Sequence, residues 1–273
     1  MSKRLVFAVA ALAAVVAVSG LALFLKGRIC YLARRSESSS LHTLLSQAKG
    51  FADKNQLAAA QEAYRQLIEG YSGSPEVMHW QKNLEGLNIK LLFSPAQTPG
   101  SVSYTVRPGD TLTRIAKAHN TTVELIKKSN RIEDDRITPG RKIKIWARPF
   151  SIFIDKSQNT LMLKSGEEVF KTYTVSTGKN NSTPAGTYKI TEKIINPPWF
   201  KPGAAAPIPA ADPENILGTR WLGLNLPSYG IHGTTDPQSL GQQVTQGCVR
   251  MSNSDVEELY AIVPKGTEVT IWD

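Results

Sequence analysis

A long hydrophobic run lies near the start of the chain. It extends from Leu5 to Leu25, 21 residues without a charged side chain. As an α-helix it would measure roughly 31 Å, which is enough to cross the hydrocarbon core of a bilayer. The preceding Lys3 and Arg4 also fit the basic start of a secretory signal, although the run is long for that class. We therefore expect a transmembrane anchor over residues 5–25 and keep a cleaved signal as the alternative.

The pattern then changes to amphipathic helices over residues 38–93, where hydrophobic residues recur at intervals of three and four. The segment before Pro75 resembles one tetratricopeptide-type helical hairpin, but a single repeat cannot bury its own hydrophobic face. We expect a helical spacer that does not form a solenoid, and a protein partner for it is left open. Pro, Gly and Ser dominate residues 94–103, a composition typical of a linker.

A compact unit follows over residues 104–147, where short hydrophobic stretches predict the order strand, helix, helix, strand. The turn "RPGD" separates the first strand from the first helix, for which Asp110 is the expected N-cap. Thr121 or Thr122 is the expected N-cap of the second helix. The alternating stretch "KIKIW" closes the unit as a strand, so we expect a βααβ arrangement with a very small core.

Residues 150–273 consist mainly of short runs rich in β-branched, aromatic and aliphatic side chains, separated by polar turns. One late helix is indicated, with Ser252 or Ser254 as its N-cap. From this spacing alone we expect a mostly-β sandwich or open barrel with one helix. The fold class of the whole chain is thus multidomain: an anchor, a helical spacer, a small βααβ domain and a mostly-β domain.

The charge of the chain bears on its partners. With 41% hydrophobic and 20% charged residues the chain is globular, and its formal net charge of +9 is carried by the part before residue 147. No zinc-finger spacing, aromatic-rich RNA motif or basic helix accompanies this charge, so nucleic acid is not the expected partner. An anionic surface such as lipid headgroups or a cell wall fits better, with a solvated basic face as the alternative for the middle unit.

Two cysteines, Cys30 and Cys248, are too few for a disulfide scaffold. No histidine stands at a metal-ligand spacing from either, so we expect no metal and no cofactor. A lone cysteine is most often an inert, buried thiol. Around Cys248, however, Gly247 allows close approach of a ligand and Arg250 is a permanent cation. His232 lies sixteen residues upstream and supplies a base, so a reactive Cys248–His232 pair stands as a hypothesis beside the inert thiol.

The unit over residues 104–146 closely resembles lysin-motif (LysM) domains along its whole length, including both of their typical turns. The resemblance implies binding of glycans that contain N-acetylglucosamine, such as peptidoglycan or chitin. In that family the ligand lies beside two loops, which here contain the expected glycan-binding residues Gly109, Asp110, Thr111, Leu112 and Pro139. The alternative is that these residues only shape turns, and both interpretations can hold because the backbone makes much of the sugar contact in the family.

Near the end of the chain, "GIHGT" and "TQGCVRM" resemble the catalytic motif of the L,D-transpeptidase family. "STPAGTY", "NPPW" and "NILGTRWLGL" resemble upstream stretches of that family, so the resemblance covers about residues 150–273. It implies a cysteine-dependent acyltransferase that acts on peptidoglycan stem peptides. Gln246 stands where many members have histidine. This departure removes a second imidazole but not the one expected to pair with the nucleophile.

By this resemblance Cys248 is the nucleophile and His232 its general base. The backbone of Gly233 would orient the imidazole, and the N–H groups of Gly247 and Cys248 are candidate oxyanion donors. Contacts with the substrate are expected of Arg250, Thr245 and Trp199. For Arg250 a purely structural ion pair, and for Trp199 core packing, are the alternatives.

Three functions remain open: an L,D-transpeptidase, an L,D-carboxypeptidase in which water replaces the acceptor amine, and a non-catalytic peptidoglycan-binding protein. The sequence cannot separate the first two, because the identity of the acceptor depends on the shape of the groove. The third is disfavoured because the motif residues are in place: His232, Gly233, Gly247, Cys248 and Arg250. We take the transpeptidase as the first interpretation. Its place would be the bacterial cell envelope, with the anchor in the inner membrane and the catalytic domain outside the cytoplasm. The basic residues that follow the anchor would by themselves predict the opposite orientation.

Overall fold

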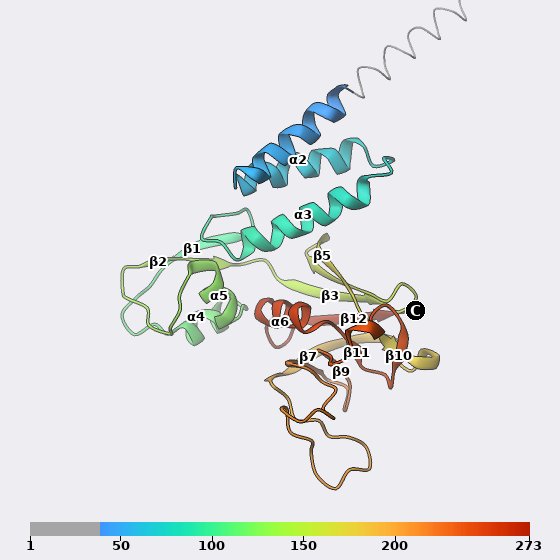
Figure 1. Cartoon of the computed structure of the whole chain (residues 1–273). Helices are drawn as coiled ribbons and strands as arrows, with labels where there is room; N and C mark the ends of the chain where they lie inside the picture. The colour runs from blue at the N-terminus through green and yellow to red at the C-terminus, as the bar shows by residue number, and fades with distance from the viewer. Residues whose placement is uncertain (1–38) are drawn as a thin grey trace, which may run out of the picture. The chain divides into compact units, whose positions relative to one another are not determined.

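The computed structural model describes residues 39–273, which divide into two compact units, one ending at Gln81 and the other beginning at Lys82 (Figure 1). Within this described part of the chain, no helix is both long and hydrophobic enough to span a bilayer. The anchor expected over residues 5–25 lies outside the described residues, as does Cys30.

Helices make up the first unit, as the spacing of its hydrophobic residues predicts. Residues 39–53 are helical, and α2 (Leu57–Gly70) and α3 (Val77–Leu92) follow. The buried face of α2 consists of Ala60, Ala63, Tyr64 and Leu67. The division between the two units falls inside α3, so the second half of this helix belongs to the unit that contains the rest of the chain.

The expected βααβ arrangement is present in the second unit. It consists of β1 (Ser101–Thr105), α4 (Leu112–Ala118), α5 (Val123–Asn130) and β2 (Lys142–Trp146). The two strands pair antiparallel, and a small core of their own lies between strands and helices. β1 already begins at Ser101, within the expected linker, because Ser101 pairs with Trp146. Gly100 packs against the same indole so closely that a Cβ on it would be 2.3 Å from the ring.

One helix cap differs from the expectation. Thr111, and not Asp110, is the N-cap of α4, because its side chain accepts the Arg114 N–H at 3.2 Å. The Asp110 carboxylate instead accepts the Arg107 N–H and the Tyr104 hydroxyl, both at 2.8 Å. Asp110 therefore closes the turn that precedes the helix, and a carboxylate used in this way is no longer available to the helix N-terminus.

The rest of the second unit is mostly β, as predicted. Eight strands form one mixed sheet in the order β11-β9-β8-β7-β12-β3-β4-β5, while β6 and β10 form a separate pair. The late helix is α6 (Asn253–Ile262), and Ser252 is its N-cap, just as Thr122 is the N-cap of α5. The strands are β3 (Phe150–Asp155), β4 (Thr160–Ser165), β5 (Glu168–Thr174), β6 (Thr177–Gly178), β7 (Gly186–Ile195), β8 (Arg220–Leu224), β9 (Gly230–His232), β10 (Gln243–Thr245), β11 (Val249–Arg250) and β12 (Glu268–Trp272).

β7 accounts for a continuous sheet where a sandwich or open barrel was expected. From Gly186 to Lys189 this strand pairs with β12, and from Ile190 to Ile195 it pairs with β8. One ten-residue strand thus joins the two halves of the sheet. Hydrophobic spacing indicates where strands lie but not that a single strand has different partners along its length, so the sequence could not predict this arrangement.

One hydrophobic core connects the mostly-β domain to the elements before it. Besides residues of the sheet and α6, it contains Ile89 and Leu92 of α3, Leu125 of α5 and Trp146 of β2. Burial of one such side chain contributes about 2 kcal/mol to stability. The βααβ unit and the end of α3 are therefore part of the same folded unit as the mostly-β domain, and their removal would expose the shared core.

Polar side chains of the βααβ unit hold the end of α3. The Lys144 ammonium, 2% exposed, donates to the carbonyls of Leu91 at 2.7 Å and Ser94 at 3.0 Å. The Ser129 hydroxyl donates to the Leu92 carbonyl at 2.8 Å. Burial lowers the pKa of Lys144 to about 8. The bonds to Leu91 and Leu92 reach carbonyl groups of the last turn of α3, which a helix leaves without partners of its own.

Candidate active site

Cys248 and His232 come from neighbouring parallel strands. β9 ends at His232, and β11 begins directly after Cys248. In the register of the two strands, Val249 lies opposite Ile231 and Arg250 opposite His232. Val249 and Ile231 are buried in the core, at 1% and 0% exposure. Because side chains alternate along a strand, the guanidinium of Arg250 and the imidazole of His232 share the other face, and Cys248 directly precedes β11.

The Cys248 thiol is half-buried and donates to the Ser228 carbonyl at 3.4 Å. Ser228 has a φ of 67°, a left-handed conformation that is uncommon for a residue with a Cβ. Burial raises the pKa of the thiol, and this effect outweighs the opposite influence of the Gly230 backbone and of Arg250. The resting site therefore holds a neutral thiol at neutral pH.

His232 is 3% exposed and is held on two sides. Its Nδ1 lies 2.7 Å from the Gly233 carbonyl, and since a carbonyl only accepts, Nδ1 carries the proton. Nε2 is then the basic nitrogen of the neutral ring. The Trp221 indole stacks on the imidazole, with the ring centres 5.9 Å apart.

The charge state of His232 follows from the same surroundings. Burial lowers its pKa to about 4, while the carbonyls of Gly233 and Leu217 act in the opposite direction and Arg250 adds to the lowering. The imidazole is therefore neutral at neutral pH and able to accept a proton. Together with the neutral thiol, this gives an uncharged pair in the resting site.

A hydroxyl shapes the turn before Cys248. The Thr245 hydroxyl donates to the Cys248 carbonyl at 2.6 Å and accepts the Gly247 N–H at 3.2 Å. Gly247 has a φ of 129°, and a Cβ there would be 2.7 Å from the ring of Tyr229. Only glycine fits this position. The expected roles of Thr245 toward the substrate and of the Gly247 N–H toward an oxyanion stay predictions, since both groups are bonded within the turn.

Thr183 joins this turn to β6. Its hydroxyl, on a residue 1% exposed, donates to the Gly247 carbonyl at 2.8 Å and accepts the Gly178 N–H at 2.7 Å. Thr183→Val keeps the shape but leaves two buried backbone groups unpaired, so we expect the free energy of unfolding to fall by about 2–4 kcal/mol. Denaturant unfolding of the full chain measures this, with exposed Thr187→Val as the matched control. Equal stability of the two variants would contradict the assignment.

Arg250 is anchored on the same face of β11. Its guanidinium donates to the Ser239 hydroxyl at 2.8 Å and lies 3.8 Å from the Asp236 carboxylate. Its backbone N–H and carbonyl bond to the backbone of Ser176 at 2.9 and 2.8 Å. Within the described residues its buried Nε has no hydrogen-bond partner. Arg250 thus makes a weak ion pair and keeps a donor that is unused in the resting site.

Trp199 lies in the connection between β7 and β8, residues 196–219. Its backbone pairs with that of Ile208, and the Lys201 ammonium lies 5.5 Å from the centre of its ring. The interactions that fix Trp199 therefore come from its own connection, and its expected contact with substrate stays a prediction. The next residue, Phe200, is 74% exposed.

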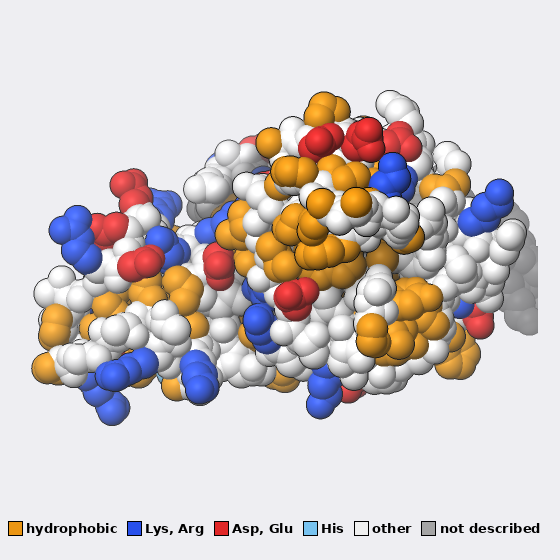
Figure 2. All heavy atoms as spheres, turned by 90° about the horizontal axis from the view of Figure 1, so that it is seen from below, with side chains coloured by type: hydrophobic (Ala, Val, Ile, Leu, Met, Phe, Trp, Pro, Cys, Tyr) orange, Lys and Arg blue, Asp and Glu red, His pale blue; other side chains and the backbone are white. Residues whose placement is uncertain are grey.

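Hydrophobic side chains gather on the face of the molecule seen from below, with Lys and Arg mostly around them (Figure 2).

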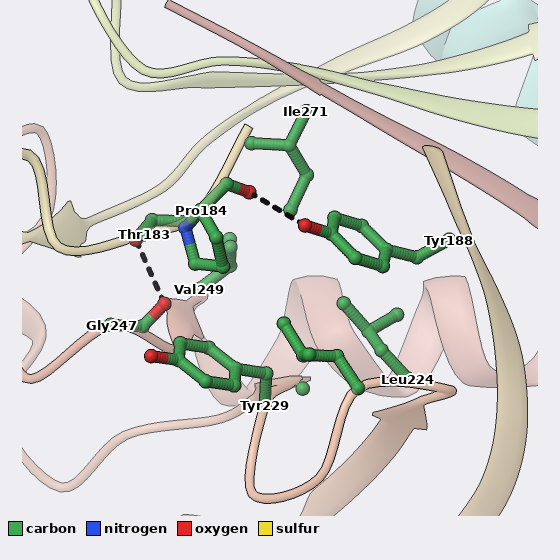
Figure 3. A pocket seen from close by; sticks show the side chains of 10 residues that line it. Thr183, Pro184, Tyr188, Leu224, Tyr229, Gly247, Val249 and Ile271 are labelled. Atoms are coloured by element: carbon green, nitrogen blue, oxygen red, sulfur yellow. Dashed lines mark hydrogen bonds between the residues drawn. The ribbon is translucent and has the colours of Figure 1, made fainter. Parts of the chain in front are cut away.

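A narrow pocket lies beside the turn before Cys248 (Figure 3). Its lining consists of Thr183, Pro184, Tyr188, Leu224, Leu226, Tyr229, Gly230, Gly247, Val249 and Ile271. The Thr183 hydroxyl is bonded to the Gly247 carbonyl, and the Tyr188 hydroxyl donates to the Ala185 carbonyl at 3.2 Å. Because these polar groups are already paired, the pocket reflects packing behind the turn and offers little to a polar substrate.

The expected glycan-binding residues lie on two loops of the βααβ unit. Gly109, with a φ of 83°, and Pro139 are exposed at the two loops. Thr111 caps α4 and Asp110 closes its turn, so both side chains already have partners. Leu112 is 2% exposed and packs into the small core, which leaves only its backbone for a ligand.

Sequence reasoning missed several residues that support the Cys/His pair: Thr183, Trp221, Ser228 and Asn253. Most lie far from Cys248 along the chain, and only the fold reveals their contacts. One signal in the sequence was Gly230, a glycine inside the motif stretch "YGIHG". A Cβ there would lie 2.7 Å from the Trp221 ring, so this glycine marks where the indole packs. Among residues 39–273 no group of three His, Cys, Asp or Glu side chains could hold a metal ion.

Two family models match the chain: the L,D-transpeptidase catalytic domain (YkuD) over residues 149–271 and the LysM domain over residues 104–146. YkuD of Bacillus subtilis (strain 168), named as an L,D-transpeptidase, is 35% identical over 177 residues, which cover 62% of this chain and 98% of YkuD. YqjB of the same strain, named likewise, is 37% identical over 128 residues, or 45% of this chain and 70% of YqjB.

Among solved structures, an L,D-transpeptidase from Mycobacterium smegmatis superimposes only loosely. Its TM-score is 0.38 at 20% identity, over 49% of this chain and 64% of its own. The sequence relatives are decisive, because nearly the whole length of YkuD is matched. The chain belongs to the L,D-transpeptidase family, with a LysM domain that precedes the catalytic domain.

Proposed function

We propose that this protein is a peptidoglycan L,D-transpeptidase that cross-links stem peptides through a thioester on Cys248. The register of β9 and β11 carries the proposal, because Cys248 directly precedes the strand that pairs with the end of β9 at His232. The bond between Nδ1 of His232 and the Gly233 carbonyl leaves Nε2 as the nitrogen that can accept a proton. Family membership supports peptidoglycan as the substrate, and an enzyme with that substrate works in the cell envelope. The anchor expected over residues 5–25 would hold it at the inner membrane with this domain outside the cytoplasm.

In the first half-reaction, Sγ of Cys248 attacks the carbonyl of the third residue of a tetrapeptide stem. Because both groups start uncharged, the thiol proton passes to Nε2 of His232 as the new C–S bond forms. The Gly233 carbonyl stabilises the imidazolium through Nδ1–H. The C–N bond to the terminal D-alanine then breaks, and the departing amine takes the proton from His232. The product is a thioester on Cys248.

In the second half-reaction, the amine of a neighbouring stem attacks the thioester carbonyl. An amide bond forms, the C–S bond breaks, and the amine proton returns to the thiol through His232. In both steps the developing oxyanion needs donors, for which we propose the N–H groups of Cys248 and Gly247. The Gly247 N–H would first leave the Thr245 hydroxyl, a bond of 3.2 Å in the resting turn.

Two side chains, those of Arg250 and Trp199, are proposed to contact the stem peptide, and Thr245 is proposed to support the turn that binds it. The Arg250 side chain keeps 13% exposure, and its guanidinium is a permanent cation that would attract a carboxylate of the stem. Trp199 lies in the β7–β8 connection next to the exposed Phe200 and would cover the bound peptide. Thr245 would act through its position in the turn, since its hydroxyl supports the Cys248 carbonyl.

Purified muropeptides incubated with the full chain test the proposal by mass spectrometry. A transpeptidase produces cross-linked dimers with loss of D-alanine, as we expect. An L,D-carboxypeptidase would produce trimmed tripeptides without dimers, because water would take the place of the acceptor amine. Unchanged tetrapeptides would contradict both enzyme assignments, and the protein would then be a non-catalytic peptidoglycan-binding protein.

We also propose that the LysM domain places the enzyme on glycan strands. The core shared with the catalytic domain includes Leu125 and Trp146 but none of the residues expected to bind glycan in the two loops. Deletion of residues 104–146 would therefore damage the catalytic domain as well as the glycan site. Single substitutions in the loops separate the two effects.

Pro139→Glu adds a negative charge and a longer side chain at an exposed loop position. We expect severalfold weaker retention on insoluble sacculi, because the new side chain would obstruct the loop and repel stem carboxylates, while acylation of Cys248 by a small β-lactam stays unchanged. Gln158→Glu, at an exposed turn of the catalytic domain, makes the same charge change and is the matched control. Co-sedimentation with sacculi measures retention. The same pelleted fraction for both variants would refute the role of the loops.

A further inference from the structure

Asn253, the first residue of α6, bonds to two backbone segments on which the site depends. Its Oδ1 accepts the N–H of Thr219 and the N–H of Thr234, each at 3.1 Å. Its Nδ2 donates to the Thr234 carbonyl at 2.9 Å. Thr219 ends the β7–β8 connection, and Thr234 follows directly on His232 and Gly233. One half-buried amide thus joins the connection to the segment that carries the imidazole.

Both segments approach this amide as closely as glycine permits. An ideal Cβ on Gly218 or on Gly233 would lie 2.2 Å from the Asn253 Oδ1. Gly218 also has a φ of 65°, in the left-handed region that favours glycine. The glycine after the catalytic histidine therefore has a steric reason, namely the room needed by the Asn253 side chain.

The Thr234 N–H and the Gly233 carbonyl belong to the same peptide unit. That unit is planar and trans, so its N–H and C=O point in opposite directions. When Asn253 fixes the N–H, it also fixes the direction of the carbonyl that accepts from Nδ1 of His232. This carbonyl decides which ring nitrogen carries the proton and where Nε2 points.

We propose that Asn253 is a positioning residue that orients the Gly233 carbonyl and thereby holds His232 in the tautomer with a basic Nε2. The proposal rests on the proposed function, because it assigns a partner to the general base of that reaction. The same side chain also fixes the end of the β7–β8 connection, because the Asn253 Oδ1 accepts the Thr219 N–H as well. If Asn253 had only a structural role, its substitution would lower the stability of the fold and leave the tautomer of the His232 imidazole unchanged.

The first test needs no activity. Nuclear magnetic resonance of the ring ¹⁵N nuclei in the full chain should show His232 as a single Nδ1–H tautomer. In Asn253→Ala we expect a mixture of tautomers, and in Asn253→Asp, which keeps the acceptor oxygen, the wild-type tautomer. Val256→Ala shortens a fully buried side chain of α6 and is therefore the matched control for a loss of stability. It should keep the tautomer.

The second test measures acylation of Cys248 by meropenem. Asn253→Ala should slow adduct formation roughly tenfold to a hundredfold near neutral pH. The deficit should shrink at high pH, where the thiol ionises without a base, and Val256→Ala should show no such pH-dependent deficit. If Asn253→Ala does not fold, Asn253→Ser replaces it, because a hydroxyl on the shorter side chain does not reach both N–H groups.

The two tests separate this proposal from the proposed function. A single Nδ1–H tautomer in Asn253→Ala or Asn253→Ser would overturn the positioning role, whatever the enzyme does. A wild-type rate and pH profile in the same variant would overturn it as well. Absence of any adduct in the wild-type chain would instead overturn the assignment of Cys248, and the ring spectra would still decide whether Asn253 orients His232.

Discussion

Cys248→Ser is expected to lose at least on the order of 10⁴-fold in cross-linking activity, while the protein stays folded. A serine hydroxyl is a far weaker nucleophile than a thiol at neutral pH and gains no comparable help from the same base. The fold should tolerate the change because the serine hydroxyl can still donate to the Ser228 carbonyl, which now accepts from the thiol at 3.4 Å. Muropeptide analysis measures the activity, and denaturant unfolding checks the fold.

The same variant should form no covalent adduct with meropenem. A carbapenem carbonyl is strained and would acylate Cys248 as a stem peptide does, but the opened ring stays attached and blocks the second half-reaction. Intact-protein mass spectrometry should therefore show a mass gain on the wild-type chain and none on Cys248→Ser. Cys30→Ser is the matched cysteine control and should gain mass like the wild type. If Cys248→Ser gains the same mass, or if neither chain gains mass, Cys248 is not the nucleophile.

The local elements of the fold could be predicted from the sequence because their signals are local. The alternating "KIKIW" is β2, and the cap residues Thr122 and Ser252 begin the expected helices. Asp110 shows the limit of such reasoning, since a carboxylate before a helix serves the cap or the turn equally well. The Tyr104 hydroxyl and the Arg107 N–H hold the Asp110 carboxylate in the turn, and the helix pattern of the sequence did not indicate these two bonds.

Long-range packing could not be predicted. Leu125 belongs to the core of the catalytic domain although it lies in the LysM domain, and neither its periodicity nor its neighbours distinguish it from Ile126, which packs in the LysM core. The two residues are adjacent on α5 and face different cores. That α5 packs against two different cores becomes visible only when the folded structure shows both cores in place.

The proposed pair of Cys248 and His232 could be named from its motif, whereas its charge state required the structure. Arg250 is a permanent cation two residues from Cys248, but burial raises the pKa of Cys248 despite the nearby guanidinium. Burial likewise lowers the pKa of His232 to about 4. Desolvation acts on both groups in the direction of the uncharged form, so the pair rests as thiol and imidazole rather than as an ion pair.

This charge state predicts how the acylation rate depends on pH. The imidazole becomes protonated only as the pH falls through its lowered pKa of about 4, so the base is available above that value. We expect the wild-type rate of adduct formation with meropenem to vary little between about pH 6 and 8, and to fall steeply as the pH approaches 4. In this range the rate does not depend on the small fraction of thiolate, because the proton leaves as the C–S bond forms.

His232→Ala should change the shape of that profile. Without the base, only the preformed thiolate attacks, so the rate should rise about tenfold per pH unit until the raised pKa of Cys248 is reached. The deficit should be about 10² to 10⁴ near neutral pH and should narrow as the pH increases. Exposed His79→Ala is the matched control and should follow the wild type. Stopped-flow or mass-spectrometric rates across pH 4 to 10 measure both curves. Parallel profiles for wild type and His232→Ala would mean that His232 does not take the proton from Cys248.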